Sequence, residues 1–258
     1  MEWARAAPRT TPRRSVAECA EAFFAQSGQH RSAHDEDKTL FTRFFWRNRN
    51  RNNQKKRRGY YIELGAFDGR KESNTRFFDE CLHWDGLLIE GNPGMYRELA
   101  RNRPHAARFF GAAGCRHVGD SVDFWTARST IGGILALARA GKNGTTTKNV
   151  ASVPCFPLQF ALDTMEVPAR VDFLSLDVEG AELDVLRTLN LSQTKIRVVL
   201  VEVANRLCAS DGCAAKGDAI EAMLVGQGYR VNRRPAVPAS AVYVLDEATW
   251  RGKRVGMG

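Results

Sequence analysis

Short apolar runs alternate with amphipathic segments along the chain from Gly59 onward. Five runs are nearly continuous in apolar residues, as expected of strands that are buried on both faces of a sheet. They cover residues 60–64, 86–90, 107–113, 171–177 and 195–203. The segments between them repeat apolar residues at helical spacing, most clearly at 74–82, 95–102, 181–189 and 217–228. This alternation predicts an α/β fold with a Rossmann-like, mostly parallel sheet and helices on both faces.

The remaining segments predict the borders of this sheet. Residues 229–233 and 241–246 form a final strand pair joined by a short Pro-rich link, which predicts one antiparallel edge strand. Residues 121–127 alternate in polarity like an exposed hairpin strand. The Gly/Thr/Lys-rich residues 132–149 are expected to form a loop.

The first 58 residues form a basic leader that differs from the rest of the chain. Periodicity is weak over residues 1–34, which we expect to fray apart from a short helix around Val16–Ala25 with Ser15 as its N-cap. A second helix is expected at Glu36–Trp46, where aromatic residues recur at helical spacing and can pack on the main domain. We therefore divide the chain into a partly disordered leader, residues 1–58, and a main domain, residues 59–258.

The net charge of +9 is concentrated in the leader. Residues 1–58 contain 14 Lys and Arg against 6 Asp and Glu, whereas residues 59–258 contain 24 against 23. An enzyme that acts on nucleic acid is expected to spread positive charge over its substrate face. We therefore expect no nucleic-acid partner for the main domain.

The chain contains no apolar run long enough for a transmembrane helix and no apolar stretch typical of a signal peptide. We expect a soluble protein in the cytoplasm, with an organelle as the alternative because the first residues are Arg-rich. The six cysteines show no C-x-x-C spacing and predict no metal site. Free thiols are expected, and Cys208 and Cys213 could bridge in an oxidising compartment.

Two strand ends together indicate a nucleoside ligand. The first strand ends in the sequence ELGAFDG, in which Gly65 and Gly69 allow a sharp turn and a close approach of the backbone to a ligand. The next strand ends in Glu90, whose carboxylate can accept hydrogen bonds from both hydroxyls of a ribose. Phe67 would crowd a pyrophosphate, which disfavours nicotinamide dinucleotides. An acid at Glu63 suits the ammonium group of an amino-acid tail.

A third strand end carries the candidate catalytic residues. Asp177 ends the run VDFLSLD, and Glu179 follows two residues later. Either carboxylate could remove a proton from an acceptor hydroxyl. As an alternative, Asp177 could simply cap the following helix.

Three segments resemble the FkbM-type methyltransferases: GYYIELGAFDGRKESNT, WDGLLIEGNPGMYRELARNRP and VDFLSLDVEGAELDVL. The resemblance extends roughly from Asp35 to Glu247 and implies S-adenosylmethionine as the cofactor. It places Asn74 near the amino-acid tail of that cofactor. The cofactor-binding residues expected from the strand ends and the resemblance are Glu63, Gly65, Ala66, Asp68, Gly69, Asn74, Glu90, Asn92 and Asp177.

The sequence therefore predicts an S-adenosylmethionine-dependent methyltransferase that methylates a hydroxyl oxygen of a small-molecule, sugar or lipid-like acceptor, with Asp177 and Glu179 as catalytic residues. A non-catalytic cofactor-binding or scaffold protein that retains the fold is the alternative, because fold alone does not establish function. No metal is expected in the site, and the sequence does not indicate an oligomeric state.

Overall fold

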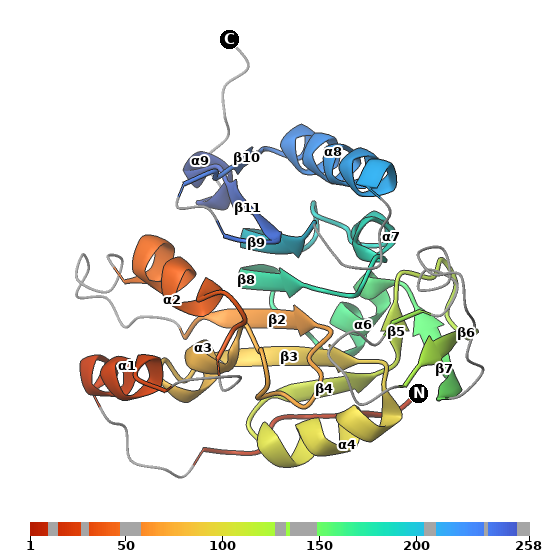
Figure 1. Cartoon of the computed structure of the whole chain (residues 1–258), viewed down its shortest axis with the longest axis horizontal. Coiled ribbons are helices and arrows are strands. Elements are labelled where there is room, and N and C mark those ends of the chain that lie inside the picture. Colours follow the sequence, from red (N-terminus) through yellow and green to blue (C-terminus); the bar gives the residue numbers. More distant parts are fainter. Residues whose placement is uncertain are drawn as a thin grey trace.

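The computed structural model of the chain describes residues 1–9, 15–26, 31–46, 58–126, 133–134, 149–203, 210–234 and 237–251. Within these ranges the main sheet has the strand order β1-β4-β3-β2-β8-β9-β11-β10, with β2 and β8 at its centre (Figure 1). Its five central strands are parallel, which confirms the expected mostly parallel sheet. They are β4 (Ala107–Phe110), β3 (Asp85–Glu90), β2 (Tyr60–Leu64), β8 (Arg170–Leu176) and β9 (Lys195–Glu202).

The expected antiparallel strand is β11 (Ser240–Leu245), which pairs with β9. It lies one position inside the edge, because β10 (Tyr229–Val231) pairs with its outer side. The opposite edge holds a second antiparallel strand that the pattern of the sequence did not predict. There β1 (Trp3–Ala4) pairs with β4.

Side chains that alternate along the central strands enter two separate apolar cores. Ile62 and Leu64 of β2 lie in one core, and Tyr61 of the same strand lies in the other. The first core is covered by α6 (Leu158–Thr164), α7 (Glu182–Arg187) and α8 (Ser210–Gly226), and the second by α3 (Arg76–Glu80) and α4 (Pro93–Asn102). The short helix α9 (Glu247–Trp250) follows β11. Helices therefore cover both faces, as the continuous apolar runs predicted.

A second, smaller sheet lies beside the carboxyl ends of the central strands (Figure 1). Its order is β5 (Ala112–Ala113), β7 (Val150–Phe156) and β6 (Asp120–Trp125). The hairpin-like strand expected at 121–127 is β6, which pairs antiparallel with β7. The sequence pattern did not reveal β7, in which Pro154 interrupts the run. The single strand expected at 107–113 is split at Gly111, which has a φ of +131°, into β4 of the main sheet and β5 of the second sheet. Apart from residues 133, 134 and 149, the loop expected at 132–149 lies outside the described residues.

Both helices expected in the leader are present. α1 (Val16–Phe24) begins with a capping box in which Ser15 and Glu18 exchange hydrogen bonds. α2 (Glu36–Leu40) continues directly into the π-helical turn η1 (Phe41–Phe45). The aromatic residues of these helices pack into the same core as α3, which agrees with the aromatic packing expected from their spacing.

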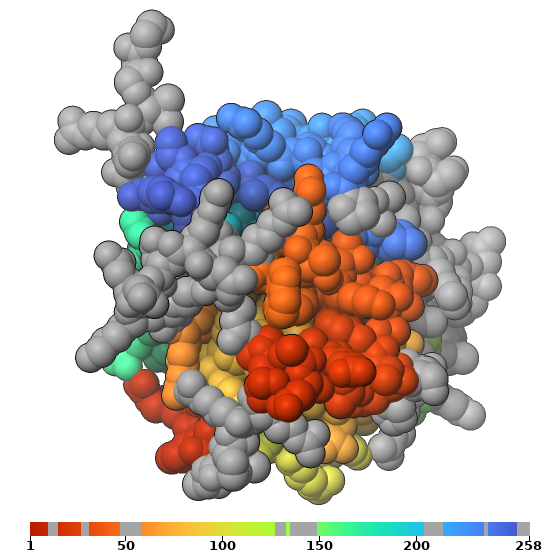
Figure 2. Space-filling view, turned by 90° about the vertical axis from the view of Figure 1, so that its left-hand side faces the viewer, coloured from red at the N-terminus to blue at the C-terminus, as the bar shows by residue number. Residues whose placement is uncertain are grey.

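The described part of residues 1–34 contacts the main domain at several places. Phe23 is only 2% exposed, and its ring lies 5.3 Å from that of Phe77 in α3. Arg9 forms an ion pair with the buried carboxylate of Asp79. Figure 2 shows the red and orange residues of the leader as a continuous part of the molecular surface. The interactions that order this segment are long-range, so local periodicity could not reveal them.

Four of the six cysteines form disulfides, so the expectation of free thiols was wrong for them. Cys19 of α1 is bonded to Cys81, and Cys115 is bonded to Cys155 of β7. The partners are 62 and 40 residues apart in the sequence, and nothing in their local spacing marks the pairs. The proposed bridge from Cys208 to Cys213 lies outside the described residues and side chains.

None of the helices in the described ranges is both long enough and apolar enough to span a membrane.

We expect Phe23→Ala to destabilise the whole domain, because the leader contributes to its core. Truncation of a buried phenylalanine costs about 3–5 kcal/mol. Urea unfolding followed by circular dichroism measures the effect. Val225→Ala, at an exposed position of α8, is the matched control and should change stability by less than about 0.5 kcal/mol. If Phe23→Ala unfolds like the control, the leader does not support the core.

Candidate active site

The turn after β2 is held between the ends of two neighbouring strands. Gly65 has a φ of +76°, and a Cβ at this position would collide with the carbonyl oxygen of Asp177. The backbone N–H groups of Gly65 and Ala66 donate to the carbonyl of Ile89 at the end of β3, at 3.1 and 3.2 Å. Glycine at position 65 is therefore required by the close approach of β2 and β8.

The backbone N–H groups of the turn donate to acceptors of the protein itself. The N–H of Phe67 donates to Glu90, that of Gly69 donates to the carbonyl of Ala66, and those of Arg70 and Lys71 donate to the carboxylate of Asp68. A phosphate-binding turn instead directs such groups at its ligand. This arrangement supports the exclusion of a pyrophosphate-containing cofactor.

Glu63 does not contact the pocket directly, in contrast to the expectation that it meets an ammonium group. Its side chain is 3% exposed. One carboxylate oxygen accepts hydrogen bonds from the hydroxyls of Ser73 and Thr75, at 2.8 and 2.6 Å, and the other accepts the N–H of Asn74 at 2.8 Å. Burial raises the pKa of Glu63, and the charge of Arg103 opposes this effect. Glu63 therefore holds the segment 73–75 in place below the pocket.

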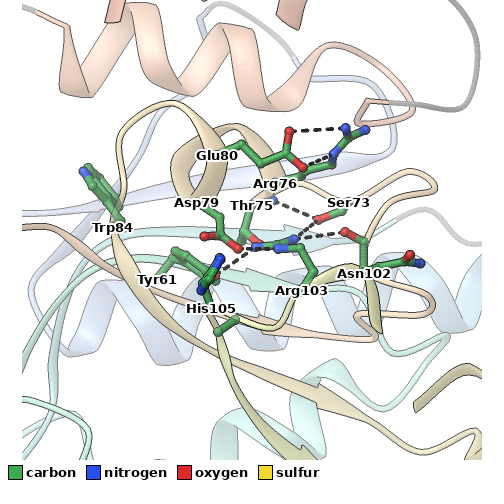
Figure 3. A network of polar contacts seen from close by, with 12 residues as sticks. Tyr61, Ser73, Thr75, Arg76, Asp79, Glu80, Trp84, Asn102, Arg103 and His105 are labelled. Atoms are coloured by element: carbon green, nitrogen blue, oxygen red, sulfur yellow. Dashed lines mark hydrogen bonds and ion pairs between the residues drawn. The ribbon is translucent and has the colours of Figure 1, made fainter. Parts of the chain in front are cut away.

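Arg103 anchors the same segment from the other side. It is 1% exposed, and its Nε donates to Asp79 at 2.5 Å. It also donates to the hydroxyl of Tyr61 at 2.8 Å and to the carbonyl of Gly69 at 3.1 Å. Figure 3 shows the guanidinium among Tyr61, Asp79, Ser73 and Thr75, the last two of which also accept hydrogen bonds from it. In the sequence, Arg103 directly follows the predicted helix 95–102, where a basic residue is common. Nothing near Arg103 in the sequence therefore indicated that its side chain is buried.

Glu90 has the position expected of a ribose-binding residue. Its carboxylate is 5% exposed and lines the pocket. It accepts the N–H groups of Phe67 and Asn92 at 2.7 and 2.6 Å. Burial raises the pKa of Glu90 to about 7, and the N–H donors counteract part of this effect. Asn92 also lines the pocket, and its side chain caps α4 by accepting the N–H groups of Gly94 and Met95.

Three carboxylates meet where β8 and β9 end. The register pairs Leu176 with Val201, which brings Asp177 and Glu202 to the ends of adjacent strands. The two carboxyls are close enough for the charge of Asp177 to raise the pKa of Glu202. One oxygen each of Asp177, Glu179 and Glu202 lie within 4.8 Å of one another, a spacing that would also admit a divalent cation. Glu202 was missed in the sequence, although the strand-end rule that identified Glu90 applies equally to the run 195–203.

The alternative in which Asp177 caps a helix is wrong. The N-cap of α7 is Ala181, and no side chain caps this helix. The carboxylate of Glu182 accepts the N–H groups of Val178 and Gly180, at 3.2 and 2.9 Å. Glu179 has a φ of +54°, so the chain turns directly after Asp177 and brings both carboxylates to one place. Asp177 is therefore available for chemistry.

These strand ends enclose a pocket with about 800 Å³ of empty space, adjoining solvent included. Of the expected cofactor-binding residues, Gly65, Glu90, Asn92 and Asp177 line it. The others do not line it: Ala66, Asp68 and Gly69 belong to the turn after β2, Asn74 belongs to the segment 73–75, and Glu63 belongs to β2. The lining residues not expected from the sequence are Leu64, Phe67, Lys71, Glu72, Ser73, Ile89, Gly91, Gly111, Ala112, Ala113, Phe124, Ile134, Val178 and Ala181.

The donors and acceptors around the pocket fit S-adenosylmethionine. The carboxylate of Glu90 suits the two hydroxyls of a ribose. The Nδ2 of Asn74 donates to Ser175 at 3.0 Å, whereas its Oδ1 is buried and has no hydrogen-bond partner. An unsatisfied buried oxygen is costly unless a ligand supplies a donor, as an ammonium group can. Ile89, Ala112 and Phe124 provide apolar surface for a base.

The sequence of this chain is similar to that of a known protein family, and its fold is similar to those of known structures. The model of the methyltransferase FkbM domain family matches residues 63–231. No curated protein matches the sequence. Among solved structures, methyltransferase FkbM from Methylobacillus flagellatus is 13% identical, with a TM-score of 0.42 over 72% of this chain and 43% of that one. The human methyltransferase 10 domain containing protein is 11% identical, with a TM-score of 0.42 over 76% and 75%. A TehB-like SAM-dependent methyltransferase from Corynebacterium glutamicum is 10% identical, with a TM-score of 0.41 over 89% and 96%.

We expect the affinity for S-adenosylhomocysteine, the product form of the cofactor, to fall as the pH is lowered through about 7. Ribose hydroxyls donate to ionised Glu90, and protonation of this carboxyl removes the charged acceptor. The loss is at most about tenfold per pH unit, because one proton is involved. Calorimetric titrations between pH 5.5 and 8 measure it.

Glu90→Gln should bind more weakly and lose the pH dependence near 7. Burial raises the pKa of Asp177 to about 6, so Asp177→Asn is the control for the second acid in this range. In Asp177→Asn, the affinity for S-adenosylhomocysteine should still depend on pH near 7. A Glu90→Gln protein that retains the wild-type affinity and slope contradicts the assignment of Glu90.

Proposed function

We propose that this chain, which belongs to the FkbM methyltransferase family and is an S-adenosylmethionine-dependent methyltransferase, methylates a hydroxyl oxygen of a small-molecule, sugar or lipid-like acceptor. The observation that carries this proposal is the close pair of carboxyls of Asp177 and Glu202, with oxygens within 4.8 Å of each other, beside the pocket. A neutral hydroxyl needs to lose its proton as it is methylated, and a positioned carboxylate can accept it.

The two carboxyls of the pair have different protonation states near neutral pH. Burial and the charge of Asp177 raise the pKa of Glu202 to about 10. Burial raises the pKa of Asp177 to about 6, and the hydrogen bond with Glu202 counteracts part of this effect. Asp177 is therefore the more acidic member of the pair, and Glu202 is the member that holds a proton more tightly. A base with a pKa near the working pH is well suited to proton transfer.

In the proposed reaction, Asp177 orients the acceptor hydroxyl and takes its proton. S-adenosylmethionine, when bound in the pocket, would supply an electrophilic methyl group to the acceptor oxygen and leave as S-adenosylhomocysteine. Glu202 stabilises the negative charge of Asp177 before the transfer. The chain's main task is to hold the reacting atoms in line, where the effective molarity of oriented groups reaches about 10⁵–10⁸ M.

The second sheet supplies an apolar wall for the acceptor. Phe124 of β6 and Ile134 form an isolated antiparallel bridge, and both line the pocket. Gly133 lies next to Glu179, because a Cβ on this glycine would approach that side chain to 3.0 Å. An acceptor placed against this wall would have apolar surface on one side and the carboxyl pair on the other. This combination supports a hydroxylated molecule with an apolar portion.

We expect Asp177→Asn to retain folding and S-adenosylhomocysteine binding and to lose about 10²–10⁴-fold in the rate of methyl transfer, the range contributed by general base catalysis. The amide is nearly isosteric but cannot accept the proton. Single-turnover transfer of a labelled methyl group over a panel of hydroxylated acceptors measures the rate, and calorimetry measures binding. In the wild type, the rate should rise with pH through about 6.

Glu202→Gln is the companion variant, because glutamine can still donate to Asp177. It should retain most of the activity. EDTA should leave the wild-type rate unchanged, since the proposed base is a carboxylate. A normal rate in Asp177→Asn would remove this residue from the chemistry, and loss of the rate in EDTA would assign the three carboxylates to a metal ion.

The two disulfides support a further proposal, that the protein resides in an oxidising compartment. Disulfides form and persist in such compartments and are rare in the cytosol. The chain isolated without reductant should yield a disulfide-linked peptide pair containing Cys19 and Cys81 in mass spectrometry. Complete alkylation of both thiols before any reduction would contradict this proposal and favour the cytoplasm.

A further inference from the structure

The pocket contains one basic side chain among its described lining residues, Lys71. The other charged groups that line it are the acids Glu72, Glu90 and Asp177. Lys71 is partly buried, and its Nζ lies 5.9 Å from the ring centroid of Phe67, within the range of a cation–π contact. In the described part of the chain no acid forms an ion pair with it. A positive group is thus held beside the pocket without a protein counter-ion.

Neighbouring polar groups of the turn are already used by the protein. The backbone N–H groups of Arg70 and Lys71 donate to Asp68, each at 2.8 Å. The hydroxyl of Ser73 and the N–H of Asn74 donate to Glu63, also at 2.8 Å. An anionic ligand group at this side of the pocket would find these donors occupied. The ammonium of Lys71 is the donor that remains for it.

A complementary acceptor lies three positions further along the same segment. Oδ1 of Asn74 is buried and has no partner among the described residues, and Asn74 directly follows Ser73, which lines the pocket. The amino-acid tail of S-adenosylmethionine carries both charges, a carboxylate and an ammonium, on one carbon atom. Within four residues, Lys71 thus offers a donor for the carboxylate of the tail, and Asn74 offers an acceptor for its ammonium group.

We propose that Lys71 binds the carboxylate of the amino-acid tail of S-adenosylmethionine. The proposal rests on this cofactor and adds to the ribose contact of Glu90. Phe67 then has a second role besides crowding a pyrophosphate. With a φ of +48° it presents its ring to Lys71, and the cation–π contact keeps the ammonium at the pocket.

The test is to compare three ligands that share the adenosine portion. S-adenosylhomocysteine carries the whole tail, decarboxylated S-adenosylmethionine lacks the carboxylate and has a methylated, positively charged sulfur, and 5′-methylthioadenosine lacks the amino acid. Calorimetry is performed with the full chain as wild type, as Lys71→Met and as Arg70→Met. Arg70 is the matched control, because it is the adjacent base, is exposed and does not line the pocket.

Lys71→Met should weaken S-adenosylhomocysteine binding by about tenfold to a hundredfold, the value of a hydrogen bond between charged groups. It should leave the affinities for the two ligands without a carboxylate within about twofold. Arg70→Met should match the wild type for all three ligands.

Three results would overturn the proposal. Equal losses for all three ligands in Lys71→Met would mean that Lys71 shapes the pocket instead of binding the carboxylate. Unchanged S-adenosylhomocysteine binding in Lys71→Met would mean that Lys71 does not contact the tail of the cofactor and is available to bind an acidic methyl acceptor. If the wild-type chain bound none of the three ligands, the assignment of S-adenosylmethionine as the cofactor would be wrong. If it still bound 5′-methylthioadenosine, the cofactor assignment would stand and only the role of Lys71 would be wrong.

Discussion

The burial of one guanidinium group is the constraint on which the rest of the site depends. Arg103 is 1% exposed, and a charge removed from water needs counter-charges and hydrogen-bond acceptors in nearly ideal positions. Asp79 supplies the closest of these, and Arg9 of the leader approaches the same carboxylate. Burial opposes ionisation of Asp79, but the two arginines hold its pKa below the ordinary value. The network therefore joins the leader, α3 and the cofactor turn into one electrostatic unit.

This unit explains why Glu63 is internal. An acid at the end of the first strand is well placed for a ligand, yet here it meets Ser73, Asn74 and Thr75. Together with Arg103 it fixes a segment that has almost no regular structure of its own. Of the acids that line the pocket, Glu90 and Asp177 come from the ends of the neighbouring strands and Glu72 from the segment after the turn. The proposed roles in binding and chemistry therefore belong to Glu90 and Asp177, and Glu63 lies beneath them in the network.

The sequence predicted the parallel sheet because its strands are continuous apolar runs, and both faces of these runs are buried. Strand ends then located Gly65, Glu90 and Asp177 at the pocket. The remainder depends on contacts between distant segments: the disulfide from Cys19 to Cys81, the two-residue strands β1 and β5, and the partners of Arg103. Glu202 shows what the sequence alone cannot reveal, because only the register of β8 and β9 makes it the neighbour of Asp177. The finer roles of the site residues remain predictions.

The close approach at Gly65 has a consequence for how this site can change during evolution. Since a side chain at position 65 would strike the carbonyl of Asp177, the turn after β2 and the strand end that carries the proposed base are held at one close separation. A change at either position would disturb the other. Under the proposed function, variation in acceptor preference is therefore expected in the second sheet and its connections, at Ile134, which lines the pocket away from this contact. A directed-evolution library for new acceptors is best confined to that wall.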